Sequence, residues 1–163
     1  MISSLTGSST IRIKRIWSLQ PPYATGFDII CKDVFNIAYG QVVYVGQYDG
    51  LYTVNIKSNN NEVLRYGHLR YVSVNTGSYI KEGQRVGFSD EYLHLEYATT
   101  WKGSSLFPVR INDLTYYKQD PQDILDGGYT IEPEVALDYA PTSTLTQVTY
   151  TEDQKSEFTG GKW

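Results

Sequence analysis

The sequence predicts a mainly β fold, in which an antiparallel sheet is curled or stacked as a sandwich, followed by an extended C-terminal arm. Short runs of β-branched and aromatic residues recur between residues 10 and 97, bounded by Gly, Asn, Asp or Pro. Residues 52–57 alternate apolar and polar side chains, as a strand with one buried face does. No stretch in this region has a helical period. The expected strands are Ile11–Ile16, Phe27–Cys31, Gln41–Gly46, Leu51–Lys57, Glu62–Leu69, Arg70–Val74, Gln84–Phe88 and Tyr92–Ala98.

Turn residues mark where these strands reverse. The Asn-rich segment Ser58–Asn61 predicts a hairpin tip, because Asn tolerates left-handed backbone geometry. Tyr48-Asp49-Gly50 predicts a second turn. Gly77 and Gly83 flank a short segment, and we expect both to adopt positive φ.

The strand pattern loosens after residue 101, and the chain divides into three parts. Pro121–Leu125 predicts one helical turn before the Gly127-Gly128 break. A length of 163 residues suits one domain with an appendage. The expected parts are an N-terminal lead-in at 1–21, a domain at 22–126 and an acidic Tyr- and Thr-rich arm at 127–163.

The arm carries the net negative charge of the chain. It has six acidic and two basic residues, which accounts for the net charge of -4. Its apolar side chains show no sustained period, yet leaving them in water is unfavourable. We therefore expect the arm to order on other protein subunits of an assembly rather than to stay disordered. The apolar residues are Tyr129, Ile131, Val135, Leu137, Tyr139, Leu145, Val148, Tyr150, Phe158 and Trp163.

Composition excludes several classes of protein. A net charge of -4 without a basic stripe argues against a nucleic-acid partner, because phosphate recognition depends on clustered Lys and Arg. Cys31 is the single cysteine, which excludes an internal disulfide and a Cys-rich zinc site, and its apolar surroundings predict a core position. The first nine residues lack the pattern of a signal peptide, and no apolar run is long enough to span a membrane. We expect synthesis in the cytoplasm and no membrane partner.

Tyrosine is over-represented, with 15 residues against five Phe and three Trp. Its ring combines a large apolar face with a polar tip. Such abundance suits half-exposed strands, carbohydrate contact or extended interfaces between subunits, and a β-rich composition alone also favours it.

A ladder of spaced apolar residues and glycines carries the first resemblance to a known family. The segment Tyr66-Gly67-His68-Leu69 is followed by Val74, Gly77, Ile80, Gly83, Val86 and Gly87. This spacing resembles the central motif of the lysostaphin/LytM-type zinc endopeptidases, which is Tyr-x-His-Leu followed by Val-x-x-Gly-x-x-Val-x-x-Gly-x-x-Ile-Gly. Barrel-sandwich hybrid domains such as lipoyl carriers share the ladder, so the ladder alone does not identify the family and other segments are needed.

Further segments match the same family in the same order. Gly26-Phe27-Asp28-Ile29 resembles the His-x-Gly-x-Asp-Ile segment, and residues 38–43 resemble the Ala-x-Gly-x-Val strand that follows it. Tyr92–Glu96 resembles the His-x-His-Phe-Glu strand, and residues 120–125 resemble the Asn-Pro-x-x-Tyr-Leu element that ends the domain. The resemblance covers residues 22–126 and implies the LytM-peptidase fold, a duplicated hybrid motif.

The same resemblance implies that the zinc site has been lost. In the family, zinc is bound by the first His and the Asp of His-x-Gly-x-Asp and by the second His of His-x-His, with water in the fourth position. These positions are Ala24, Asp28 and His94 in this chain. Alanine has no ligand atom, and two protein ligands hold zinc far more weakly than three. We therefore expect no zinc and no other cofactor, and a charge-assisted pair between Asp28 and His94.

Two further features of the relict site are altered. The family's other two histidines, which activate water and stabilise the oxyanion, correspond to His68, which is kept, and to Tyr92. Tyrosine, with an ordinary pKa near ~10, is no base at neutral pH. The loop before the His-x-His strand is shortened to residues 88–91, which truncates a groove wall. We interpret the histidines and Asp28 as satisfied interior polar residues in preference to a repurposed cluster. The relict groove is expected to be lined by Tyr66, Asp28, His94 and Tyr92, with no catalytic set intact.

We therefore interpret the chain as a non-catalytic structural or assembly protein built on an inactivated LytM-like fold. LytM-like domains occur at phage tail tips, so a virion protein of the tail or baseplate, made in the host cytoplasm, is the favoured interpretation. One alternative is a regulator or a module that binds cell-wall peptide or glycan, because degenerate relatives activate cell-wall amidases. The other alternative is an active peptidoglycan endopeptidase with altered metal ligands.

Overall fold

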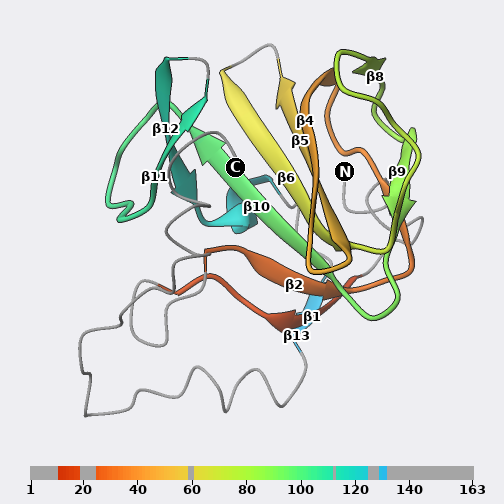
Figure 1. The fold of residues 1–163 in the computed structure, drawn as a ribbon. Coiled ribbons are helices and arrows are strands. Elements are labelled where there is room, and N and C mark those ends of the chain that lie inside the picture. Colours follow the sequence, from red (N-terminus) through yellow and green to blue (C-terminus); the bar gives the residue numbers. More distant parts are fainter. Residues whose placement is uncertain (1–10, 19–24, 59–60, 112, 125–128, 132–163) are drawn as a thin grey trace.

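The structure is a computed structural model that describes residues 11–18, 25–58, 61–111, 113–124 and 129–131. Its strands form a ten-stranded sheet and a three-stranded sheet, which confirms the mainly β, antiparallel prediction (Figure 1). Within these residues the chain forms one short 3-10 turn, η1 (Pro121–Ile124), where a helical turn was expected. No helix in the described ranges is long and apolar enough to cross a membrane.

The main sheet has the strand order β13-β1-β2-β10-β6-β5-β4-β8, and the β11–β12 hairpin is attached to it through β10. The small sheet has the order β3-β9-β7. Neighbouring strands are antiparallel except β1 and β13, which run parallel. The main-sheet strands are β1 (Ile11–Arg15), β2 (Phe27–Ile30), β4 (Gly40–Tyr48), β5 (Leu51–Ser58), β6 (Glu62–Leu69), β8 (Tyr79–Ile80), β10 (Leu93–Thr99), β11 (Pro108–Ile111), β12 (Leu114–Gln119) and β13 (Tyr129–Ile131). The small-sheet strands are β3 (Asp33–Phe35), β7 (Tyr71–Val72) and β9 (Arg85–Phe88).

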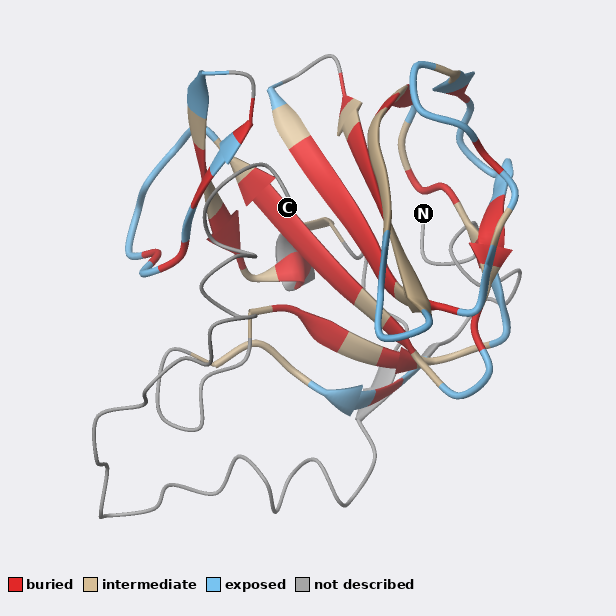
Figure 2. Cartoon of the chain, viewed as in Figure 1, coloured by how far each residue is buried: buried red, intermediate tan, exposed pale blue. Residues whose placement is uncertain are grey.

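The hydrophobic core lies between the two sheets. Val34 of β3 and Val86 of β9 belong to the same buried cluster as Val54 of β5 and Leu95 of β10. Figure 2 shows this as buried residues along the central strands of the main sheet. Because side chains alternate along a strand, the residues between the core positions point to the opposite face of the main sheet. That opposite face carries the candidate site.

The predicted turns are present with the backbone geometry that their residues favour. Asp49 and Gly50 have φ of 51° and 77°, and Asn61 has φ of 57°. Gly77 and Gly83 have φ of 92° and 83°, as expected for the ends of a segment bounded by two reversals.

Two β-bulges interrupt the register of the main sheet near one end of β10. In β1, one extra residue, Lys14, lies between the pairs that Ile13 and Arg15 form with β2. In β6, the register shifts between Tyr66 and Leu69, and His68 has a positive φ of 63°. Because of this bulge Leu69 reaches the core and His68 does not.

Several strands were not expected from the sequence. The β11–β12 hairpin lies where the alternation seemed to end, since Pro, Arg and Asn interrupt its apolar residues. It is held by a second cluster, in which Val109, Ile111 and Tyr116 pack against Val63 and Ala98 on the face opposite the core. The short strands β3, β8 and β13 were also missed.

The main sheet extends beyond the expected domain boundaries of 22 and 126. Strand β1 lies in the expected lead-in and β13 in the expected arm, and the two pair with each other. Three parts of the sequence analysis fall outside the described residues. They are Ala24, which stands where the family has its first zinc-binding His, residues 1–10, and the arm after residue 131.

Tyr66 belongs to the core, so the expectation that it lines the relict groove is wrong. Its side chain is 0% exposed and lies within the core cluster between the sheets. Its hydroxyl donates to Asn36 Oδ1 and accepts from the Ile37 backbone N–H, both at 3.0 Å. Burial raises the pKa of this phenol. Tyr66 therefore anchors the loop between β3 and β4.

Replacement of Tyr66 by Phe removes only the hydroxyl and leaves two buried partners without it. We expect Tyr66→Phe to lower the free energy of unfolding by about 1–2 kcal/mol in urea denaturation. The matched control is Tyr71→Phe, because Tyr71 is 57% exposed, and it should leave stability unchanged. Equal stability of the two variants would contradict this anchoring role.

Candidate functional site

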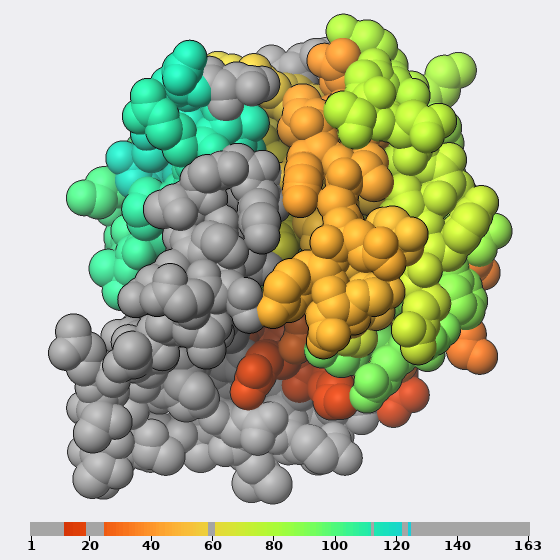
Figure 3. Space-filling model, viewed as in Figure 1, coloured from red at the N-terminus to blue at the C-terminus, as the bar shows by residue number. Residues whose placement is uncertain are grey.

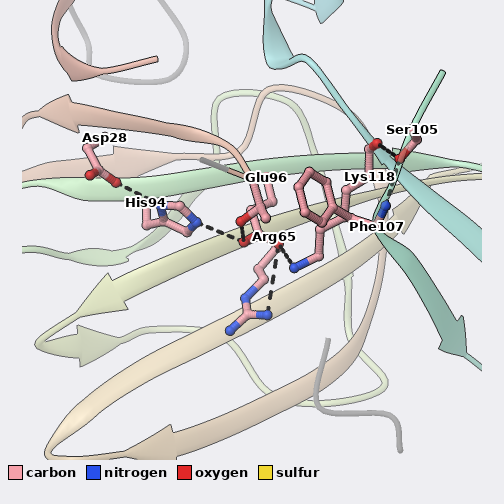
Figure 4. A network of polar contacts seen from close by, with 8 residues as sticks. Asp28, Arg65, His94, Glu96, Ser105, Phe107 and Lys118 are labelled. Carbon is pink, nitrogen blue, oxygen red and sulfur yellow. Dashed lines mark hydrogen bonds and ion pairs between the residues drawn. The ribbon is translucent and has the colours of Figure 1, made fainter. Parts of the chain in front are cut away.

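Five ionisable side chains meet on the face of the main sheet opposite the core (Figure 4). We call Asp28, Arg65, His94, Glu96 and Lys118 the charge cluster. Neighbouring strands bring these residues together, because His94 is paired with Asp28 and Glu96 with Arg65 across adjacent strands. Lys118 comes from β12 and is paired with Ala98, two residues beyond Glu96.

His94 is bound by a carboxylate at each ring nitrogen. Its Nδ1 lies 2.7 Å from Asp28 Oδ1, and its Nε2 lies 2.8 Å from Glu96 Oε1. The first contact confirms the expected pair between Asp28 and His94. Burial alone would lower the pKa of His94, but the bonds to the two carboxylates outweigh it and raise the pKa to about 10. The imidazole is thus held as a cation between two acids.

Glu96 is the buried centre of the charge cluster. Its side chain is 1% exposed, and Oε2 lies 2.7 Å from Lys118 Nζ and 3.9 Å from Arg65 Nη1. Thr25 Oγ1 donates to Oε1 at 2.8 Å. Burial would raise the pKa of Glu96, but the charges of Lys118, Arg65 and His94 hold it well below its ordinary value. The carboxylate is therefore ionised although it is shielded from water.

The β11–β12 hairpin delivers Lys118 to this carboxylate. The Lys118 side chain is 0% exposed, and its backbone N–H donates to Phe107 O at 2.9 Å. Ser105 Oγ donates to Lys118 O. Phe107 is fixed in turn by an edge-on contact with Trp17 at 5.5 Å between ring centroids. The position of the ammonium group thus depends on packing of the loop before β11.

Sequence reasoning placed Asp28 and His94 in the site but missed three members of the charge cluster. Glu96 was part of the motif that carried the resemblance, and Arg65 lies in an expected strand. Lys118 had only one signal, its place two residues after Tyr116 on the same face of a strand. Its partner Glu96 lies 22 positions earlier, so no local pattern connects them.

The other two relict positions, His68 and Tyr92, lie against each other. Their rings stack at 3.8 Å between centroids with an interplanar angle of 11°. His68 Nδ1 lies 3.1 Å from Tyr92 O, and because a carbonyl oxygen only accepts, this nitrogen carries the proton. Both bulges contribute here, since Lys14 Nζ lies 5.5 Å from the centre of the Tyr92 ring.

Tyr92 also neighbours the charge cluster. Partial burial raises the pKa of its phenol, and the negative charges of Asp28 and Glu91 raise it further. The described relict positions Asp28, His68, Tyr92 and His94 are therefore gathered at one end of β10. A phenol with a raised pKa is further from serving as a base than an ordinary tyrosine.

The spacing of the remaining ligand positions can be compared with that of a zinc centre. Two ligands at 2.0–2.1 Å from a tetrahedral zinc ion are about 3.3 Å apart. Asp28 Oδ1 and His94 Nδ1 are 2.7 Å apart, which is the distance of a direct hydrogen bond. In the described ranges, no group of three or more His, Cys, Asp or Glu side chains is arranged to hold a metal ion.

Residues 23–108, just over half of the chain, match the sequence profile of peptidase family M23. The chain belongs to peptidase family M23. This agrees with the order of motifs around Asp28, His68 and His94. No curated protein sequence matches the chain.

Solved structures support the M23 fold. A chain of the SpoIIQ–SpoIIIAH pore-forming complex superposes with a TM-score of 0.57 at 18% identity, covering 85% of this chain and 96% of that one. The solution structure of lysostaphin gives 0.56 at 21% identity, with 88% of this chain and 60% of lysostaphin covered. The catalytic domain of lysostaphin from Staphylococcus simulans gives 0.50 at 21% identity, with 71% and 89% covered. At these identities the similarity establishes the fold alone.

Removal of the Lys118 ammonium should strongly destabilise this M23 domain, because it leaves Glu96 buried with less compensating charge. We expect Lys118→Met to lower the free energy of unfolding by about 3–5 kcal/mol in chemical denaturation. Lys102→Met is the matched control, since Lys102 is exposed in the same region, and it should change stability by less than about 0.5 kcal/mol.

A double variant separates charge from packing. Adding Glu96→Gln to Lys118→Met removes the buried negative charge and should restore part of the loss. The single variant Glu96→Gln is measured as well. If the losses in free energy of unfolding of the two single variants simply add in the double variant, the two side chains are not coupled.

Proposed function

We propose that this chain is a non-catalytic member of peptidase family M23 and serves as a structural part of a protein assembly. The observation that carries the proposal is that each ring nitrogen of His94 already has a carboxylate partner, at 2.7 and 2.8 Å. A histidine binds a metal through the lone pair of a ring nitrogen, and here both nitrogens face hydrogen-bond acceptors. Zinc binding would require the Asp28–His94 bond to open.

The number of zinc-binding side chains also supports the loss of zinc. The position that the family motif assigns to a zinc-binding histidine is Ala24, which has no donor atom. Asp28 and His94 would then be two protein ligands where the family uses three. Glu96 offers no replacement, because its oxygens face His94, Thr25 and Lys118.

The groups that would act on water are also unsuited to hydrolysis. Tyr92 occupies the position of one catalytic histidine, and its pKa is raised above the ordinary value of tyrosine. His68 stacks on Tyr92 and uses Nδ1 to bond the backbone. Without a metal ion to lower the pKa of water, this pair lacks a strong nucleophile at neutral pH.

The assembly role is supported by features outside the charge cluster. The segment from residue 127 carries six acidic and two basic residues together with many aromatic and aliphatic ones, a composition suited to binding along a partner. One structure with the same fold is a chain of the SpoIIQ–SpoIIIAH complex, so the fold is compatible with subunit contacts. We propose further that this assembly is a phage virion, with the protein at the tail or baseplate and other virion subunits as its partners.

Metal analysis tests the loss of catalysis. The protein purified in the presence of zinc should contain far less than one zinc ion per chain by mass spectrometry, and it should not cleave glycine-rich or cross-linking peptides. Ala24→His should bind zinc more tightly than the wild type, whereas Thr76→His, which adds a histidine at an exposed site elsewhere, should not. One zinc ion per wild-type chain, together with peptide cleavage, would overturn the proposal.

Truncation tests the assembly role. Removal of residues 132–163 should lower the number of chains in the assembly that the full chain forms. This number is obtained from the mass measured by size-exclusion chromatography with light scattering. A chain with the same segment in scrambled order is the control, because it keeps the composition and loses the pattern of contacts. If the truncated chain is soluble and assembles like the full chain, the arm is not the contact.

A further inference from the structure

A pair of exposed tyrosines stands apart from the charge cluster. Tyr39, which precedes β4, is 47% exposed, and Tyr79 of β8 is 64% exposed. Their rings stack with 6.2 Å between centroids and an interplanar angle of 18°. Figure 3 shows the yellow-green segment around residue 80 beside the orange residues of β4 on the same visible face. The two rings are thus nearly parallel and both are exposed, and we call this pair of aromatic side chains the platform.

The platform is held by a buried amide beneath it. Asn36 is 0% exposed, and its Nδ2 donates to Ala38 O at 2.5 Å and to Lys81 O at 3.1 Å. Ala38 precedes Tyr39, and Lys81 follows Tyr79 by two residues. One side chain thus fixes the backbone beside both rings, which lowers the entropy lost when a ligand binds.

The turn before Tyr79 is fixed to β4 as well. Gly77 N–H donates to Val42 O and Val42 N–H donates to Ser78 O, both at 2.8 Å. Gln41 Nε2 donates to Gly77 O at 3.2 Å. These bonds hold Tyr79 against the strand that follows Tyr39. The stacked rings are therefore positioned before any ligand arrives.

The surroundings of the platform determine the kind of ligand it fits. A stable protein interface buries about 800 Å² on each side and contains several apolar anchors. Here the exposed apolar surface is that of two rings. The residues on either side of Tyr79 along the chain, 75–77 and 81–84, are exposed and are polar or glycine. A strand of a partner is also disfavoured, because Asn36 already bonds the Lys81 carbonyl at the edge of the sheet.

We propose that Tyr39 and Tyr79 bind a pyranose oligosaccharide. The flat C–H face of a sugar ring packs on an aromatic face, and its hydroxyl groups need hydrogen-bond partners at the rim of the contact. Gln41, which is paired with Tyr79 across β4 and β8, and the tyrosine hydroxyls supply uncharged polar groups near the rings. Sugars joined by equatorial β-1,4 bonds present extended flat faces, so they are the class that this platform accommodates. This inference does not depend on the loss of zinc.

Titration of the full chain with chitotetraose and with cellotetraose tests the site. In heteronuclear NMR, the amides of Gly40, Gly77 and Tyr79 should shift on addition of at least one of the two sugars. Tyr39→Ala and Tyr79→Ala should each weaken binding about five- to tenfold. Tyr39→Phe and Tyr79→Phe keep the rings and should retain most of the affinity.

Tyr71→Ala is the matched control, because Tyr71 is 57% exposed on β7 and should not contribute. Each variant is first compared with the wild type in thermal unfolding. The location of the shifts in the wild type decides the site even if an alanine variant fails to fold. No shift with either tetrasaccharide, shifts confined to residues elsewhere, or an equal loss in Tyr71→Ala would overturn the proposal.

Discussion

A carboxylate that is buried and ionised sets the strongest constraint on this domain. Removing such a group from water is unfavourable by several kcal/mol unless charges of opposite sign surround it. Glu96 meets this requirement through Lys118, Arg65 and His94, which come from three neighbouring strands. The β11–β12 hairpin must therefore pack correctly for the centre of the main sheet to be stable. In this way the stability of the hairpin and of the loop before it is coupled to that of Asp28 and His94.

The charge cluster also gives Asp28 and His94 a structural role within the M23 fold. In a metalloenzyme the cation that balances a carboxylate and orients the imidazole is the metal. In this chain the imidazole itself pairs with Asp28, while ammonium and guanidinium groups balance Glu96. The residues of the family motif therefore retain a structural reason to be present. Their presence alone is not a sign of peptidase activity.

The sequence was sufficient for the parts of the molecule that local chemistry determines. Strand β6 was predicted with its observed ends, and Asn61, Gly77 and Gly83 adopt the expected backbone geometry. The Asp28–His94 pair followed from the resemblance. Tyr66 was misplaced, because a motif position does not reveal which face of a sheet a side chain occupies when a bulge lies two residues away. Lys118 was missed because its importance depends on a partner 22 positions earlier, which no periodicity reports.

The parallel pairing of β1 and β13 has a consequence for how the chain folds. Ile11 is in register with Tyr129, so the outermost ladder of the main sheet joins residues 118 positions apart in the sequence. During synthesis β1 emerges early but its outer neighbour emerges only after the rest of the domain. Contacts between such distant segments form slowly, because the entropy of closing a long loop is lost before the contacts stabilise the chain. Until then one edge of the sheet is open to pairing with other chains, and nascent protein is most prone to aggregate during that interval.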